Sequence, residues 1–182
     1  AIKVITDAVA LDPEVRRAFD NEVRSVARLA HRGIVQVYDY GTIDEAADEA
    51  SEGRLASGSP YLAMEFLGAG SLDTSVSPGD WPSLRRLLLD LLSALAHAHS
   101  RGLVHRDLTP GNILYSDSGG PGSEDGRRRH PRITDFGIAH ALTSDDGDED
   151  SESHSGTVLY MSPEQLHGRW RDHGPWTDLY AV

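Results

Sequence analysis

Two carboxylates and one amide stand in short polar stretches between apolar segments of this 182-residue chain. Asp107 and Asn112 lie five residues apart, and Asp135 follows the β-branched pair 133–134 a short way on. Carboxylate and amide oxygens are the ligands that Mg²⁺ prefers, and a carboxylate can also orient a hydroxyl and accept its proton. These three residues therefore predict a site that could hold a divalent metal and position a nucleophile.

Apolar residues at helical spacing predict two helices. Leucines recur at every third or fourth position over 84–95 and predict a buried core helix, which ends at Gly102 just before the first polar stretch. Asp12 and Pro13 are a typical helix start, and the apolar face that follows predicts a helix as far as Gly33. The first of these helices is the element that delivers Asp107 to its loop.

Alternating residues predict three strands, at 1–5, 34–40 and 61–67. Between the last two, the stretch 44–60 is rich in Ala, Ser, Gly and acids and has no periodicity, so we expect a solvated loop. The acidic, serine-rich stretch 144–155 cannot bury itself and is expected to be mobile.

Composition narrows the classes of function. A net charge of −12 argues against an electrostatic nucleic-acid binder, and the absence of cysteine excludes disulfides and thiolate metal sites within the chain, which suits a reducing cytosol. The longest apolar run, 87–98, is interrupted by Asp90 and is too short to span a membrane. The nine histidines show no spacing typical of a transition-metal site, and His97 and His99 are interpreted as helix-end residues that favour the helix dipole.

The polar motifs, taken in order, resemble the eukaryotic-like (Hanks-type) Ser/Thr protein kinases, and their wording is most similar to bacterial members. Each motif alone is weak, but the ordered set is specific. It consists of Lys3, Glu22, His105-Arg106-Asp107 with Asn112, Asp135-Phe136-Gly137, Ser162-Pro163-Glu164 and Asp178.

The resemblance implies an α+β, bilobal protein-kinase-like fold that is truncated at both ends. It places a small antiparallel-sheet lobe at 1–67, without the glycine-rich loop, and a mainly helical lobe at 68–182. Because the chain begins at Ala1 and stops at Val182 within a patterned segment, we expect it to be part of a longer protein and inactive by itself.

The resemblance also implies the roles of the catalytic residues. Asp107 orients the substrate hydroxyl and accepts its proton, and Asn112 and Asp135 hold Mg²⁺. Lys3, held by an ion pair with Glu22, grips the α- and β-phosphates of ATP. Taken without the resemblance, Lys3 and Glu22 are each more typical of solvated surface residues.

Adenine contacts are implied for a second group of residues. Ala1 and Leu114 match the residues that sandwich the base, and Met64 matches a residue that lines the pocket behind it. Main-chain groups of Glu65 and Leu67 match those that hydrogen-bond adenine.

Two further residues carry implied roles in the activation segment. Arg106 matches an arginine that pairs with phosphate on this segment, and Thr157 matches a threonine that contacts the catalytic acid in Ser/Thr-directed kinases. The acids at 145–150 could substitute partly for that phosphate, or the stretch could be only a solvated loop. Acids here favour a basic protein substrate by complementarity.

One departure from the family pattern bears on mechanism: residue 109 is threonine, where these kinases normally have lysine. Losing one donor to the developing charge costs on the order of 10²–10³ in rate, roughly 3–4 kcal/mol. Two readings therefore remain, an active Ser/Thr kinase that uses Mg-ATP and a pseudokinase that binds ATP or acts as a scaffold. Small-molecule phosphotransferases fit poorly, because they lack an activation segment that closes with Pro163 and Glu164.

We expect a cytoplasmic protein, or the cytoplasmic domain of a larger protein whose membrane tether, if present, lies outside this chain. The expected partners are ATP and a protein with a Ser or Thr acceptor, and nucleic acid is not expected. The sequence predicts neither the physiological substrate nor the oligomeric state.

Overall fold

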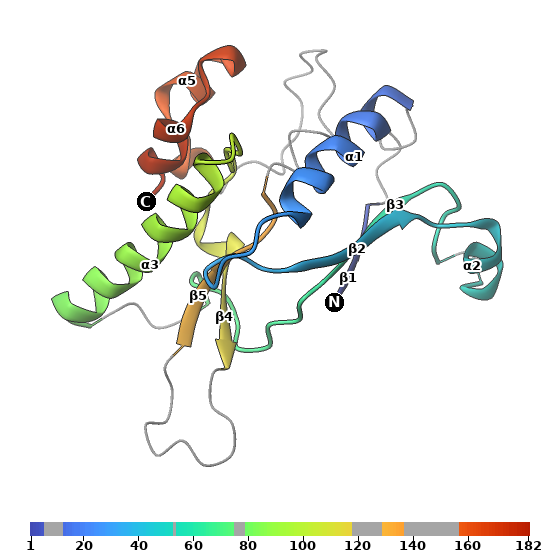
Figure 1. Ribbon diagram of the computed structural model, residues 1–182, viewed down its shortest axis with the longest axis horizontal. Helices are drawn as coiled ribbons and strands as arrows, with labels where there is room; N and C mark the ends of the chain where they lie inside the picture. The colour runs from blue at the N-terminus through green and yellow to red at the C-terminus, as the bar shows by residue number, and fades with distance from the viewer. Residues whose placement is uncertain (6–12, 53, 75–78, 118–128, 137–156) are drawn as a thin grey trace. The chain divides into compact units, whose positions relative to one another are not determined.

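The computed structural model describes residues 1–5, 13–52, 54–74, 79–117, 129–136 and 157–182 (Figure 1). The chain divides into two compact units. Within the described residues, the first unit takes in 1–30 and 36–66, and the second takes in 31–35 and the residues from 67 onward. No helix among the described residues is both long and apolar enough to cross a membrane.

The first unit is a three-stranded antiparallel sheet with one long helix (Figure 1). The strands run in the order β1 (Ile2–Val4), β3 (Pro60–Met64), β2 (Val37–Thr42), with β3 in the centre. Helix α1 (Pro13–Ala27) contacts β2, and its apolar face is buried because Phe19, Val23 and Val26 recur at helical spacing. The small antiparallel sheet expected from the resemblance is confirmed.

Two local predictions in this unit were wrong. Helix α1 ends at Ala27 and not near Gly33, because the Leu29 amide bonds the Val26 carbonyl in a turn that buries the Leu29 side chain outside the helix. The predicted loop 44–60 contains a helix, α2 (Glu45–Ala50). Its start is capped by the Asp44 carboxylate, which accepts the Ala47 amide at 2.7 Å, a local signal that composition alone conceals.

Helix α3 (Trp81–His99) organises the second unit. It begins at Asp80, whose carboxylate accepts the Ser83 amide at 2.8 Å, and proline at the second helical position suits this start. The face with Leu91 and Leu95 is buried against the rest of the unit. The prediction of a helix over the leucine stripe is confirmed.

The first half of α3 is not the buried element that the leucines predicted. Leu84 and Leu92 are exposed, and Leu84, Leu87 and Leu88 line a cavity of about 500 Å³. Thr109 also lines this cavity. Within the described residues, the helix therefore packs on its second half only.

Short elements complete the second unit. Strands β4 (Ile113–Asp117) and β5 (Arg129–Ile133) form an antiparallel pair in which Ile113 lies opposite Ile133. The remaining elements are η2 (Pro110–Asn112), η4 (Thr157–Tyr160), α5 (Pro163–Leu166), η5 (Trp170–Asp172) and α6 (Pro175–Tyr180).

The segment 31–35 pairs with β5, which corrects the prediction of one strand over 34–40. Ile34 forms a parallel bridge with Ile133, and the Val35 amide bonds the Ile133 carbonyl at 2.9 Å. Only Val37–Thr42 belong to β2 in the first unit. Alternation along the chain cannot show that one apolar run pairs with two different partners.

Candidate active site

The loop that carries Asp107 starts directly after α3. Gly102 adopts a positive φ of 77°, and the Leu103 amide bonds the Ala98 carbonyl, so the chain turns sharply off the helix. Two residues later, His105 is fully buried. Glycine after the leucine-rich stretch is the sequence signal for this turn.

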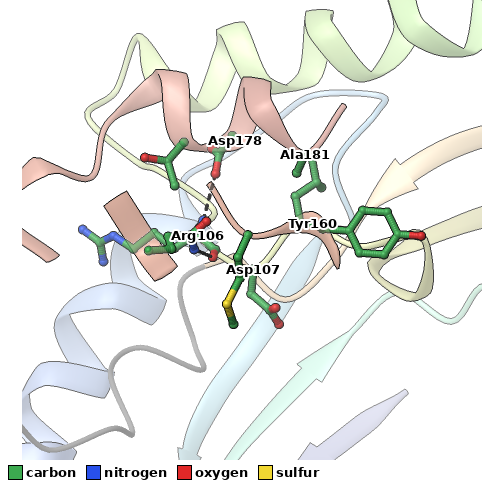
Figure 2. Close-up of a pocket in the computed structure, with 9 residues that line it drawn as sticks. Arg106, Asp107, Tyr160, Asp178 and Ala181 are labelled. Carbon is green, nitrogen blue, oxygen red and sulfur yellow. Dashed lines mark hydrogen bonds between the residues drawn. The ribbon is translucent and has the colours of Figure 1, made fainter. Parts of the chain in front are cut away.

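A buried carboxylate from α6 holds the loop backbone. Asp178 accepts the His105 amide and the Arg106 amide, each at 2.8 Å, one with each carboxylate oxygen. Figure 2 draws the bond to Arg106. Arg106 has a φ of 66°, which is strained for a residue with a Cβ. The Gln165 side-chain amide donates to the Arg106 carbonyl at 2.5 Å. Both the amide and the carbonyl of the strained residue Arg106 are therefore fixed by hydrogen bonds.

Asp107 faces away from this anchor. In Figure 2 the carboxylates of Asp178 and Asp107 lie on opposite sides of the loop backbone. Asn112 donates its side-chain N–H to the Asp107 carbonyl at 2.7 Å and lies 3.3 Å from the Asp107 carboxylate. The pair predicted from the five-residue spacing is therefore in direct contact, and Asp107 stays only half-buried.

His105 connects the two polar loops. Its Nε2–H donates to the Thr134 carbonyl at 2.8 Å, and its Nδ1 accepts the Asp107 amide at 3.3 Å. The ring also packs on Phe136, with centroids 4.7 Å apart. Burial lowers the pKa of the His105 imidazole, so the ring stays neutral and keeps one donor and one acceptor. The neutral ring sets the spacing between Asp107 and the next loop.

Asp135 comes directly after Thr134, and Thr134 is hydrogen-bonded to Asn112. The Thr134 amide donates to the Asn112 carbonyl at 3.0 Å, and Asp135 itself adopts a φ of 60°. Because the Asn112 amide nitrogen is directed to Asp107, the Asn112 side-chain oxygen is the atom that remains for a cation. With the Asp135 carboxylate it makes a pair of hard oxygen ligands, which fits Mg²⁺ better than a transition metal.

A metal site built from protein side chains alone is not present in the described part of the chain. No three His, Cys, Asp or Glu side chains gather there in a way that could hold an ion. Mg²⁺ characteristically takes one or two protein ligands and completes its shell with water and phosphate.

Lys3, Glu22, Ala1, Met64 and Glu65, which are predicted to bind ATP or to support its binding, lie in the first unit. Lys3 is exposed on β1 opposite Leu62, and Glu22 is half-buried on α1. The Ala1 carbonyl accepts the Met64 amide at 2.8 Å, and the Glu65 amide donates to the Gln36 carbonyl at 2.9 Å. The ion pair between Lys3 and Glu22 stays a prediction.

Four other predicted residues lie in the second unit. Leu67 is half-buried, and Leu114 is half-buried on β4, where it bridges to Ser71. Arg106 lies in the loop just described. The backbone of Thr157 begins η4, but its side chain lies outside the described residues, as do the acids at 145–150.

Sequence reasoning did not assign roles to two side chains that hold the loop. The sequence identifies Asp178 only as a member of the ordered motif set, and it assigns no role to Gln165. Glu164, the last residue of the Ser162-Pro163-Glu164 motif, accepts the Thr177 hydroxyl at 2.7 Å. That hydrogen bond lowers the pKa of the Glu164 carboxyl. The signal for Gln165 is its place three residues after Ser162, which forms a capping box.

The family model and the relatives that match this chain are all protein kinases. The family model described as "Protein kinase domain" matches residues 1–182. The serine/threonine-protein kinase PknA of Mycobacterium tuberculosis (strain ATCC 25618 / H37Rv) is 37% identical over 186 residues, which cover 100% of this chain and 38% of PknA. The DNA damage-responsive serine/threonine-protein kinase RqkA of Deinococcus radiodurans is 37% identical over 187 residues, covering 100% of this chain and 24% of RqkA.

Solved structures give the same result for the fold. The crystal structure of the PknI kinase domain of M. tuberculosis matches with a TM-score of 0.60 at 26% sequence identity, over 99% of this chain and 57% of that chain. The chain thus spans well under two thirds of the length of the relatives that it matches.

Proposed function

The chain belongs to the protein kinase family, and we propose that the protein containing it transfers the γ-phosphoryl group of Mg-ATP to a Ser or Thr hydroxyl of a protein substrate. The observation that carries the proposal is the hydrogen-bonded connection of Asp107 to Asn112 and, through His105 and Thr134, to the Asp135 loop. These are the residues that phosphoryl transfer requires, and they converge in one unit.

Asp107 has the position of a general base. Its backbone is fixed by the Asn112 side chain and by the His105 ring, while its carboxylate is half-buried and, among the described residues, accepts one long hydrogen bond, from Asn112. Such a carboxylate can orient an incoming hydroxyl and accept its proton late in the transfer.

Asn112 and Asp135 are the residues that would hold Mg²⁺. Bound there, Mg²⁺ neutralises charge on the phosphate oxygens, which is the main need of phosphoryl transfer. Asp135 has a positive φ of 60°, and the hydrogen bond from the Thr134 amide to the Asn112 carbonyl joins the two loops that carry these residues.

The remaining assignments complete the proposal on the basis of the family resemblance. Lys3, held by Glu22, would bind the phosphates. The resemblance assigns adenine contacts to Ala1, Met64, Glu65, Leu67 and Leu114. Arg106 would pair with phosphate on the activation segment, and Thr157 would favour Ser and Thr acceptors. We expect regulation through that segment, a substrate with basic residues, and a cytoplasmic location.

A pseudokinase is the second candidate, and Thr109 is the observation that favours it. Thr109 precedes η2, its side chain makes no capping bond, and it provides no cation near Asp107. A slow enzyme survives the loss of one donor, because roughly 3–4 kcal/mol is less than the acceleration that enzymes commonly achieve.

Phosphate transfer from labelled ATP by the full-length protein separates the two candidates. For an active kinase, Thr109→Lys leaves the rate unchanged or raises it, and Asp107→Asn abolishes transfer. Asp39→Asn, on an exposed strand residue, is the matched control and leaves transfer unchanged. A protein that binds nucleotide but transfers no phosphate even as Thr109→Lys is a pseudokinase.

A further inference from the structure

A pair of histidines joins the segment 31–35 to helix α3 on a side of the second unit that the proposed site does not use. The imidazole rings of His31 and His97 lie 5.1 Å apart between centroids, with their planes inclined by 33°. His31 Nε2 also lies 3.2 Å from the Ser93 hydroxyl oxygen on α3. Two titratable rings are thus in contact where a loop meets a core helix.

The hydrogen bonds require both rings to be neutral. His31 Nδ1 accepts the Gly33 amide at 3.0 Å, so its proton is on Nε2, where it can be donated to Ser93. His97 Nδ1 accepts from the Arg101 guanidinium at 3.3 Å. His97 Nε2 is buried without a hydrogen-bond partner among the described residues. A second proton on His31 would remove the acceptor that the Gly33 amide uses.

The charges around the pair also oppose protonation. Arg32 flanks His31, and Arg101, just beyond the end of α3, flanks His97. His130 on β5 lines a small crevice together with Arg32, Gly33 and Asp90. Asp90 is the acid that faces this cluster, and it already bonds the Arg32 guanidinium at 2.9 Å. A new proton therefore meets more cations than anions.

The segment 31–35, in which His31 accepts the Gly33 amide, is hydrogen-bonded to the end of β5, just before the predicted metal ligand Asp135. Gly33 accepts the Ile133 amide at 2.8 Å, and Ile133 accepts the Val35 amide at 2.9 Å. The next residue, Thr134, receives the His105 hydrogen bond and precedes Asp135. Movement of the segment away from α3 would loosen the end of β5 and the loop after it.

We propose that His31 and His97 form a pH-sensitive contact that holds the Asp135 loop in place while both rings are neutral and releases it when either ring gains a proton. The proposal rests on the proposed function, because the loop it controls is the one assigned to Mg²⁺. On protonation the Gly33 hydrogen bond is lost and the two rings repel each other and the flanking arginines.

The pKa values of the two rings agree with this geometry. Burial lowers the pKa of His31, and His97 and Arg32 lower it further, against a smaller opposite effect of Asp90. Burial and Arg101 lower the pKa of His97. Since the unfolded chain takes up protons near the ordinary value of 6.5, the stabilising contribution is complete above that pH and is lost as the pH falls below it.

Urea unfolding of the full-length protein between pH 5.5 and pH 8 tests the proposal. The double variant His31→Asn with His97→Phe keeps an acceptor for the Gly33 amide and an aromatic ring, but cannot titrate. We expect its stability to depend less steeply on pH than that of the natural protein, by up to about two protons. His167→Asn, which changes an exposed histidine directly after α5, is the control and leaves the steepness unchanged.

His31→Ala tests the Gly33 hydrogen bond separately, because it removes both the Gly33 acceptor and one titrating ring. It should lower stability at pH 8 and lower it less at pH 5.5, where the natural protein has itself lost the hydrogen bond. If the double variant and the natural protein lose stability in parallel as the pH falls, the proposal is wrong. If the double variant does not fold, His97→Phe alone must show a reduced steepness, and an unchanged steepness overturns the proposal.

The catalytic consequence is measured separately. The pH profile of kcat/KM for ATP should fall below pH 6.5 in the natural protein and should be flatter in the double variant. Because unfolding uses no nucleotide, a protein with the expected unfolding behaviour but no phosphate transfer would overturn the proposed function alone. Parallel pH profiles of activity would overturn the link between the histidine pair and the Asp135 loop.

Discussion

Asp178 and Asp107 lie on opposite sides of one loop backbone, and their surroundings differ sharply. The Asp178 side chain is fully buried and accepts from two backbone amides and from His99 Nε2 at 2.7 Å. The Asp107 carboxylate is half-buried and, within the part of the chain that the structure describes, accepts one long hydrogen bond, from Asn112. A carboxylate whose oxygens are all engaged can only hold structure, whereas one with vacant lone pairs can meet a substrate. Asp178 thus holds the loop backbone, and Asp107 on the other side is the carboxylate proposed to act on the substrate.

Replacing Asp178 should have the largest effect on folding. Asp178→Ala leaves two loop amides and the His99 ring without their buried acceptor and releases the strained Arg106 peptide. We expect a loss of about 3–5 kcal/mol in the free energy of unfolding, with transfer lost as well. Urea unfolding of the full-length protein measures this, and Asp172→Ala, at an exposed acid before α6, is the control. Equal losses for the two variants would remove the distinction between an anchor and a surface acid.

Asn112→Ala tests whether the residue between the two aspartates serves both purposes. It removes the 2.7 Å bond to the Asp107 carbonyl and the proposed Mg²⁺ ligand. We expect a loss of about 1–3 kcal/mol in unfolding free energy and a higher Mg²⁺ concentration for half-maximal transfer. Transfer titrated with Mg²⁺ at fixed ATP gives the second quantity. An unchanged Mg²⁺ requirement would assign Asn112 to support alone.

Gln165→Ala should have a smaller effect on the same side of the loop. The Gln165 amide holds the Arg106 carbonyl, opposite the Asp178 contacts. Loss of this bond should lower stability by about 1 kcal/mol and reduce transfer modestly, because Asp178 still fixes the peptide. Gln165→Glu, which cannot donate, should behave like alanine in the unfolding measurement. A loss as large as that of Asp178→Ala would mean that the strained peptide depends on both contacts equally.

A pH effect at His105 should be the smallest that can be resolved. Because burial lowers the pKa of this ring, its contribution is complete above the ordinary value of 6.5 and is lost as the pH falls below it. In the double variant that lacks the titrating pair at 31 and 97, the remaining pH dependence of unfolding should therefore have this sign. A stability that rises on acidification over the same range would contradict the neutral, doubly bonded ring.

Much of this site follows from local sequence. The leucine stripe predicts α3, and the glycine after it marks the turn. The spacing of Asp107 and Asn112 predicts a polar site, and the structure adds the hydrogen bond between the two residues. The role of Asp178 does not follow, because its partners lie 72 and 73 residues away in the chain and nothing local distinguishes it from a solvated acid.

The same limit explains the errors in the fold. One apolar run, 34–40, is divided between two units because its first residues pair with β5, a contact that no periodicity encodes. His97 was interpreted as a helix-end residue, and only the fold brings it to His31. Helix α2 was missed for the opposite reason, since a cap at Asp44 is a local signal hidden in a polar composition.

The central claim is that the Asp107 carboxylate, and not merely the loop around it, carries phosphoryl transfer. The most direct measurement is the rate of γ-phosphate transfer by full-length Asp107→Asn, with its urea midpoint measured on the same sample. We expect the rate to fall by at least about 10²-fold while the midpoint stays that of the natural protein. A folded Asp107→Asn protein that transfers phosphate at the natural rate would contradict the account.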